Sequence, residues 1–172
     1  YMKTVSFRSE IVVTADLADG VVLQEHKATR LSNGGYALGT ELVDANAYTL
    51  IPGVDIPKDP HIVITGKSPI KANLFVEIQD TLDTVTVNGQ SKKLISYSLT
   101  SNWQQTDRSP KYGGTVYQYN AVLDENFDGN LIYILENNEI TVSQYVKSHD
   151  YTENKDTDVL KIYVYLEQIP DQ

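Results

Sequence analysis

The segment from Leu50 to Gln79, LIPGVDIPKDPHIVITGKSPIKANLFVEIQ, constrains the fold more than any other part of the chain. Its prolines at positions 52, 57 and 60 favour turns and strand starts, because proline fixes φ and has no N–H to donate. Apolar residues then alternate with polar ones on both sides of Gly66-Lys67-Ser68-Pro69. This period of two is typical of half-buried strands. The segment therefore predicts a corner, a strand, a turn and a second strand of an antiparallel sandwich.

The same pattern recurs along the chain, with turn residues between the alternating stretches. Asn88-Gly89 lies between two of them and predicts a tight hairpin, because both turn residues tolerate positive φ. The last stretch, VLKIYVYLE, predicts a strand with Leu160, Ile162, Val164 and Leu166 directed inward and Tyr163 and Tyr165 directed outward. LIYILE, at 131–136, is interpreted as a short helix.

The sequence therefore predicts an all-β fold: a jelly-roll-like antiparallel β-sandwich with about nine or ten strands and little helix. At 172 residues the chain is long enough for one domain with one core, so we expect a single β-sandwich domain over 1–172.

Composition excludes several classes of function. The net charge of −9 argues against a nucleic-acid ligand, which requires clustered Lys and Arg, and also against an anionic membrane surface. The absence of cysteine excludes disulfides, thiolate metal sites and a cysteine nucleophile. No apolar run reaches the roughly 18 residues that a membrane span needs. The chain opens without the pattern of a signal peptide, so we expect either a cytosolic protein or the mature portion of an exported one.

One loop resembles part of a calcium site. Asp124, Asn126 and Asp128 in DENFDGN, followed by Gly129, match the first half of the pattern D-x-[DN]-x-[DN]-G. The twelfth position of such a loop carries a bidentate glutamate, whereas here Glu136 falls one place late. The three side chains are thus a calcium candidate, and a plain Asp-Gly turn is the alternative.

Catalytic residues are harder to identify. His26, His61 and His149 lie far apart in sequence and match no zinc-hydrolase spacing, so surface or structural roles are expected for them. The carboxylate pairs Asp156/Asp158 and Glu136/Glu139 have the chemistry for acid–base catalysis on a glycoside, but solvated acidic loops explain them equally well. We predict no catalytic site and no cofactor apart from the calcium candidate.

Four aromatic residues form a candidate interaction surface: Trp103, Tyr112, Tyr117 and Tyr119. Aromatic faces bind sugars and proteins, but aromatic side chains also fill cores. Both interpretations stay open, with the core favoured for most of the four.

Three stretches resemble a known family when they are taken together. They are the corner LIPGVDIPKDPHIVITG with its following strand, Trp103 followed by YGGTVYQYNAVLDENFDGNLIYIL, and the closing LKIYVYLEQ. In register, over about residues 46–168, they resemble exported Gram-positive proteins with the alternate, SipW-type signal peptide, the TasA- and camelysin-like family.

The resemblance implies a jelly-roll sandwich, secretion, and a structural role at the cell surface or in the extracellular biofilm matrix. It also implies assembly with itself or with related surface subunits, in which an N-terminal strand is added to the next subunit's sheet. The candidate donor or edge strand lies within residues 1–14, from Thr4 to Thr14; pairing within its own domain is the alternative. Two other functions stay open: an adhesin-type module that binds glycan or host protein, and a camelysin-like metalloprotease.

Overall fold

The computed structural model describes residues 5–14, 20–65, 71–127, 131–148 and 159–170. Within these ranges the chain forms sixteen strands and two short 3₁₀ helices, so the predicted all-β fold is confirmed. The strands are β1 (Val5–Val13), β2 (Val21–Gln24), β3 (His26–Arg30), β4 (Tyr36–Leu42), β5 (Ala45–Leu50), β6 (Asp55–Pro57), β7 (His61–Ile64), β8 (Ala72–Asp80), β9 (Thr84–Val87), β10 (Gln90–Lys93), β11 (Ile95–Ser96), β12 (Trp103–Gln105), β13 (Thr115–Tyr119), β14 (Leu131–Tyr133), β15 (Glu139–Val142) and β16 (Val159–Gln168). The helices are η1 (Glu136–Asn138) and η2 (Gln144–Ser148).

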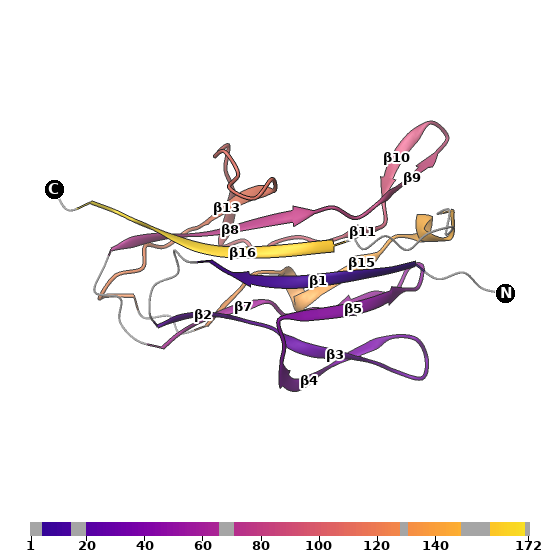
Figure 1. Ribbon diagram of the computed structural model, residues 1–172, viewed down its shortest axis with the longest axis horizontal. Helices are drawn as coiled ribbons and strands as arrows, with labels where there is room; N and C mark the ends of the chain where they lie inside the picture. The colour runs from indigo at the N-terminus through magenta and orange to yellow at the C-terminus, as the bar shows by residue number, and fades with distance from the viewer. Residues whose placement is uncertain (1–4, 15–19, 66–70, 128–130, 149–158, 171–172) are drawn as a thin grey trace.

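The largest sheet has six strands in the order β12-β13-β8-β16-β1-β5. Two three-stranded sheets, β14-β7-β2 and β11-β15-β6, and two hairpins, β3–β4 and β9–β10, complete the fold. The hairpins project on opposite sides of the molecule in Figure 1. Inward side chains from the large sheet and from both three-stranded sheets share one hydrophobic core, which makes the arrangement sandwich-like.

More strands are present than the nine or ten predicted, because several extended stretches change partner midway. The stretch 21–30 is one example: β2 pairs with β7, whereas β3 pairs with β4. Glu25 lies between the two strands and is fully buried. A single alternating pattern in the sequence thus covers two strands of different sheets.

The predicted turn at Asn88-Gly89 is confirmed. Both residues have positive φ, 51° and 78°, and they join β9 to β10 as a two-residue hairpin. The helix expected at 131–136 is wrong. Leu131–Tyr133 forms β14, paired with β7, and the burial of Ile132 and Ile134 follows the period of a strand.

β1 lies in the interior of the six-stranded sheet. It pairs in parallel with β16 and antiparallel with β5, as Figure 1 shows. The expectation of an edge strand is therefore wrong for the described residues 5–13, and the alternative, pairing within its own domain, holds. Residues 1–4 lie outside the described part of the chain.

One loop, 106–114, packs on part of the outer face of this sheet, over β8 and β16. Leu160, Ile162 and Val164 of β16 are buried in the main core, as predicted. Tyr165 faces the opposite side but is only 2% exposed, because it packs with Phe75, Val116 and Tyr112 in a second cluster. The tyrosines predicted to face outward therefore do not face solvent.

Candidate functional site

A cluster of two histidines and one aspartate lies at the corner before β7. Asp59 precedes β7, His61 is the first residue of β7, and His26 is the first residue of β3. Each offers one metal-ligating atom, and these atoms lie within 4.8 Å of one another. The antiparallel pairing of β2 with β7 sets Gln24 opposite His61 and so brings the segment around His26 to the corner.

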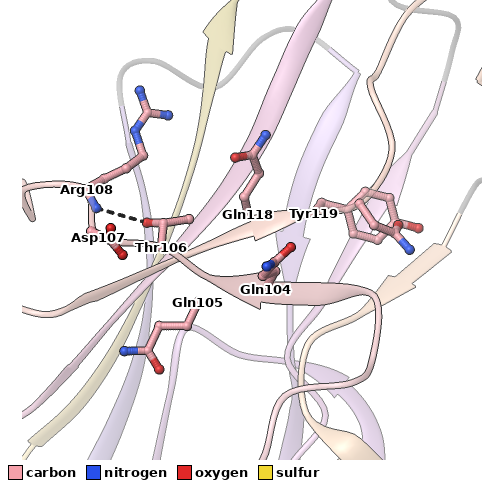
Figure 2. A pocket seen from close by; sticks show the side chains of 8 residues that line it. Gln104, Gln105, Thr106, Asp107, Arg108, Gln118 and Tyr119 are labelled. Carbon is pink, nitrogen blue, oxygen red and sulfur yellow. Dashed lines mark hydrogen bonds between the residues drawn. The ribbon is translucent and has the colours of Figure 1, made fainter.

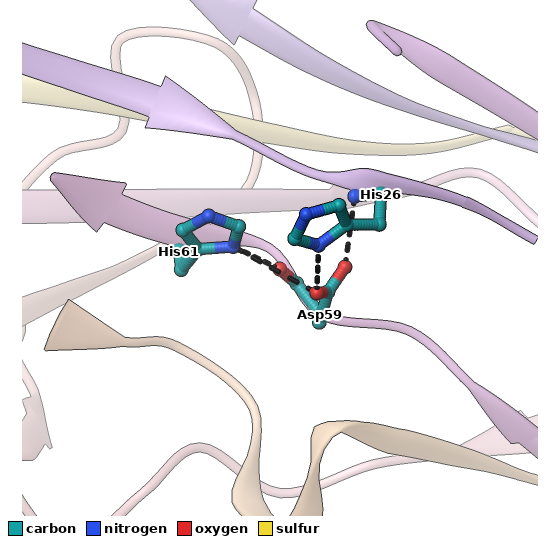
Figure 3. Close-up of side chains that lie close together, drawn as sticks. All are labelled: His26, Asp59 and His61. Atoms are coloured by element: carbon teal, nitrogen blue, oxygen red, sulfur yellow. Dashed lines mark hydrogen bonds and ion pairs between the residues drawn. The ribbon is translucent and has the colours of Figure 1, made fainter. Parts of the chain in front are cut away.

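Hydrogen bonds fix the orientation of both rings (Figure 3). The Nδ1 atom of His26 lies 2.6 Å from Oδ2 of Asp59, and Nδ1 of His61 lies 2.6 Å from the backbone oxygen of Asp59. Both partners are acceptors, so each neutral ring carries its proton on Nδ1. The backbone N–H of His26 donates to Oδ1 of Asp59 at 2.9 Å, which holds the carboxylate in place. The two rings are stacked, with centroids 5.4 Å apart.

A buried ion pair adjoins this cluster on the same two chain segments. The side chains of Lys58 and Glu25 are both fully buried, and Lys58 Nζ donates to Glu25 Oε1. Burial lowers the pKa of Lys58, and the carboxylate of Glu25 opposes this shift. The sequence analysis predicts only a corner and the start of a strand here. The structure instead shows four polar or charged side chains, Glu25, Lys58, Asp59 and His61, that are buried together here.

The three histidines lie far apart in sequence, but the fold brings two of them, His26 and His61, together at Asp59. Thirty-three residues separate His26 from Asp59, so no short motif joins them. The signal in the sequence is weak: Glu25-His26 lies in the polar run QEHK, which follows the apolar VVL, and Lys58-Asp59 lies between two prolines. His149 lies outside the described residues.

The four aromatic residues do not form one surface. Trp103 is 7% exposed, belongs to the main core, and donates from Nε1 to the backbone oxygen of Tyr133 at 3.0 Å. Tyr117 and Tyr119 pack against the same core. Tyr112 lies on the other face of the sheet, where its ring stacks on Tyr163 with centroids 4.0 Å apart. The core interpretation thus holds for Trp103, and the other three are divided between two faces.

The calcium candidate is only partly described. Asp124 Oδ1 accepts the backbone N–H of Asn126 at 2.8 Å, which is the geometry of a turn closed by an aspartate. Asp128 lies outside the described residues, as do Asp156 and Asp158. Among the residues that the structure describes, Asp124 does not belong to a group of three or more histidine, aspartate or glutamate side chains that could hold a metal ion. Glu136 is the first residue of the short helix η1, and Glu139 follows that helix as the first residue of β15.

A polar groove runs along β12 and β13 (Figure 2). Its volume is about 710 Å³. Its lining is rich in amide side chains and carries one acid and one base: Gln104, Gln105, Thr106, Asp107, Arg108, Gln118, Tyr119 and Asn120. Gln104 and Gln118 are direct partners across the two strands. Such a surface offers many hydrogen-bond donors and acceptors.

Fold and sites together define an all-β, sandwich-like protein with a partly buried histidine–aspartate cluster and a polar groove. Comparison with models of known families, with curated proteins and with solved structures finds no match for the chain. The resemblance to the TasA- and camelysin-like family stays a prediction. None of the helices in the described ranges has the length and apolar character to cross a bilayer.

Proposed function

We propose that this protein is a secreted structural subunit of a cell surface or extracellular matrix, and that copies join by exchanging β1. One observation carries the proposal: β1 occupies an interior position between two strands that are both distant from it in sequence. Six residues of β1 are in register with β16 and six with β5. A strand with such partners makes the same contacts when another copy supplies it, which is the basis of strand addition and domain swapping.

The side chains of β1 support exchange with a specific register. Phe7 and Ile11 are buried in the main core, and the ring of Phe7 stacks on Tyr48 of β5 at 5.1 Å. Arg8, on the other face, is exposed. A slip by one residue would exchange these two faces, so a strand from another copy is held to the same register.

A disulfide lock tests the proposal. Arg8 and Ala47 are exposed and directly opposite each other on β1 and β5, a geometry that suits a disulfide. The chain has no cysteine, so the variant Arg8→Cys/Ala47→Cys holds a single defined pair. We expect the oxidised variant to remain monomeric under conditions in which the wild type forms oligomers or filaments, and the reduced variant to assemble.

The matched control is Thr29→Cys/Ala37→Cys, an exposed opposite pair within the β3–β4 hairpin. It adds a disulfide without restraining β1, so it should assemble in both redox states. Assembly of the oxidised Arg8/Ala47 variant at the wild-type rate would refute strand exchange, and so would a wild type that stays monomeric throughout.

Glycan binding is a second candidate, favoured by the polar groove on β12 and β13. Amide side chains, an arginine and an aspartate provide the hydrogen bonds that a sugar requires, and Tyr119 adds an aromatic ring. A glycan array that compares the wild type with Gln105→Ala and Gln118→Ala tests it. Loss of a specific signal in both variants supports this function, and an array without specific signal rejects it.

We propose no catalytic role. Hydrolysis of casein by the pure chain, measured with and without a chelator, is the direct test. Metal-dependent turnover would replace the structural proposal with the metalloprotease alternative.

A further inference from the structure

We propose that His26, Asp59 and His61 bind one divalent transition-metal ion of the zinc class. The site is separate from the strand exchange proposed above, because none of the three residues belongs to β1, β5 or β16. Their ligand atoms already lie within 4.8 Å of one another in two segments that strand pairing holds together.

The distances around Asp59 suit a small ion after limited adjustment. Oδ2 of Asp59 lies 2.6 Å from Nδ1 of His26 and 4.0 Å from Nδ1 of His61. Tetrahedral zinc, with bonds of about 2.0–2.1 Å, places its ligand atoms about 3.3 Å apart. The distance from Oδ2 to His26 Nδ1 would therefore increase by about 0.7 Å, and the distance to His61 Nδ1 would decrease by about 0.7 Å. Rotation of the side chains would supply both changes.

The proton balance is simple. Each neutral ring now carries its proton on Nδ1, where an oxygen accepts it. Metal binding through Nδ1 moves that proton to Nε2 of the same ring, and no net proton is released by the histidines. Figure 3 shows the second nitrogen of each ring directed away from Asp59, so the relocated protons do not meet the metal.

The ligand set selects the class of metal. Two imidazole nitrogens and one carboxylate oxygen suit zinc and its transition-metal neighbours, whereas calcium and magnesium prefer oxygen alone. Three protein ligands leave a fourth position for water. The His26 side chain, at 32% exposed, is the most accessible of the three and provides the path for entry.

Groups behind the ligands hold them in place. Oδ1 of Asp59 accepts the backbone N–H of His26, which leaves Oδ2 for the metal. The buried pair Glu25–Lys58 joins the same two segments, because Glu25 directly precedes His26 and Lys58 directly precedes Asp59. Outer partners of this kind orient metal ligands. The bound ion would cross-link the β2–β3 junction to the corner before β7, thirty-three residues away.

The experiment uses the full chain and Zn²⁺ alone. Competition with a chromophoric chelator gives the affinity and stoichiometry, and we expect one ion per chain. His61→Ala and His26→Gln each remove a ligand and should weaken binding more than about 100-fold, since loss of an outer partner alone costs about 10- to 100-fold. His149→Ala changes the remaining histidine of the chain and should leave the affinity unchanged.

Two further readouts separate ligation from a structural effect. NMR of the imidazole nitrogens should show the proton of both rings moving from Nδ1 to Nε2 when zinc is added. Zinc should also raise the melting temperature of the wild type and of His149→Ala but not of His26→Gln, because an ion that binds only the folded state stabilises it. Since His26 is part-exposed, His26→Gln keeps the test valid even where His61→Ala fails to fold.

Three results would overturn the proposal. They are a wild type that takes no zinc from a chelator of micromolar affinity, full-strength binding that persists in a folded His26→Gln variant, or binding that disappears in His149→Ala.

Discussion

Glu25 and Glu77 are both fully buried carboxylates, and their partners differ. Only Oε1 of Glu25 is hydrogen-bonded, because its Oε2 has no hydrogen-bond partner among the described residues. Glu25 pairs with the ammonium group of Lys58, a side chain from the corner before β7. Glu77, on the outer face of β8, accepts the backbone N–H groups of Lys111, Tyr112 and Gly114 at 2.7, 2.7 and 3.1 Å. One carboxylate is matched by a charge and the other by backbone dipoles.

The two carboxylates stabilise different parts of the fold. The pair Glu25–Lys58 joins the β2–β3 junction to the corner before β7. The neighbouring strands also contribute side chains to the main core, so the pair belongs to the same packed unit as the rest of the fold. The loop 106–114 packs on the outer face of β8 and β16, and three of its backbone amides donate to Glu77. Gly114 must approach β8 closely, because a Cβ at this position would lie 2.3 Å from the backbone oxygen of Ile78. We therefore expect failure at Glu25 to destabilise the whole fold and failure at Glu77 to release one loop.

The largest expected effect follows from removing the buried cation. Lys58→Met leaves the charge of Glu25 buried without a partner, which should lower the free energy of unfolding by about 3–5 kcal/mol. Urea denaturation measures this loss. The double variant Glu25→Leu/Lys58→Met removes both charges and should recover most of the lost stability. Equal losses in the single and double variants would mean that packing, rather than the unpaired charge, sets the cost.

Glu77→Gln is the matching change on the outer face. The amide keeps the shape but loses the charge, and its NH₂ group meets backbone N–H groups that need an acceptor. We expect a loss of about 2–3 kcal/mol, because hydrogen bonds to charged groups contribute about 1.5–3 kcal/mol each and water restores part of them. Hydrogen exchange should accelerate at the amides of residues 111–114 and stay unchanged in β2 and β7. Uniform acceleration across the fold would erase the proposed difference between the two carboxylates.

Alkaline pH provides a third comparison, through the tyrosine beside Glu25. Burial, and in second place the charge of Glu25, raises the pKa of Tyr48 above its usual value of 10.0. Below pH 10 Tyr48 is protonated in both the folded and the unfolded chain, so the folded state keeps the full stabilisation that the protonated hydroxyl provides. Above pH 10 the unfolded chain ionises first, so stability falls by up to about 1.4 kcal/mol per pH unit for this group.

Tyr48→Phe should therefore lose less stability between pH 9 and pH 11 than the wild type, by roughly 1 kcal/mol. Urea denaturation at the two pH values measures the difference. Tyr133→Phe is the control, because the Tyr133 side chain is exposed. Parallel losses in the wild type and in Tyr48→Phe would contradict the assigned cause.

The sequence predicted the strands better than it predicted their partners. Period-two alternation identified β7, β8 and β16, and Asn88-Gly89 identified the β9–β10 turn, because these signals are local. It failed at Leu131–Tyr133, where a short apolar run suits a helix as well as a strand until β7 pairs with it. It also failed at β1, because no local signal tells an edge strand from one that β16 and β5 enclose.

The candidate site was hidden for the same reason. His26 and Asp59 meet only because β2 pairs with β7, and no spacing along the chain encodes that contact. The sequence assigned Tyr163 and Tyr165 of β16 to the correct face of the sheet. It did not predict that a loop buries Tyr165, because that loop is held by three backbone N–H groups that donate to Glu77, and these contacts cannot be read from the neighbours of Glu77 in sequence.

The smallest expected effect lies at the rim of the outer loop. Arg108 Nη2 contacts both carboxylate oxygens of Glu167 at 2.8 Å, and its guanidinium lies 4.3 Å from the centroid of the Phe75 ring. Both partners of the ion pair are more than 40% exposed, so water and salt screen it. Arg108→Gln should lower the free energy of unfolding by less than about 1 kcal/mol, and high salt should reduce the difference from the wild type.

Arg8→Gln is the matched control for this rim contact, because Arg8 forms an exposed ion pair with Glu10 away from the loop. The two arginine variants should have similar small effects in urea denaturation at low salt. If Arg108→Gln instead costs more than Glu77→Gln, the loop is held by its exposed rim rather than by the buried carboxylate. Glu77 would then not be the group that holds the loop 106–114, and the proposed difference between Glu25 and Glu77 would be wrong.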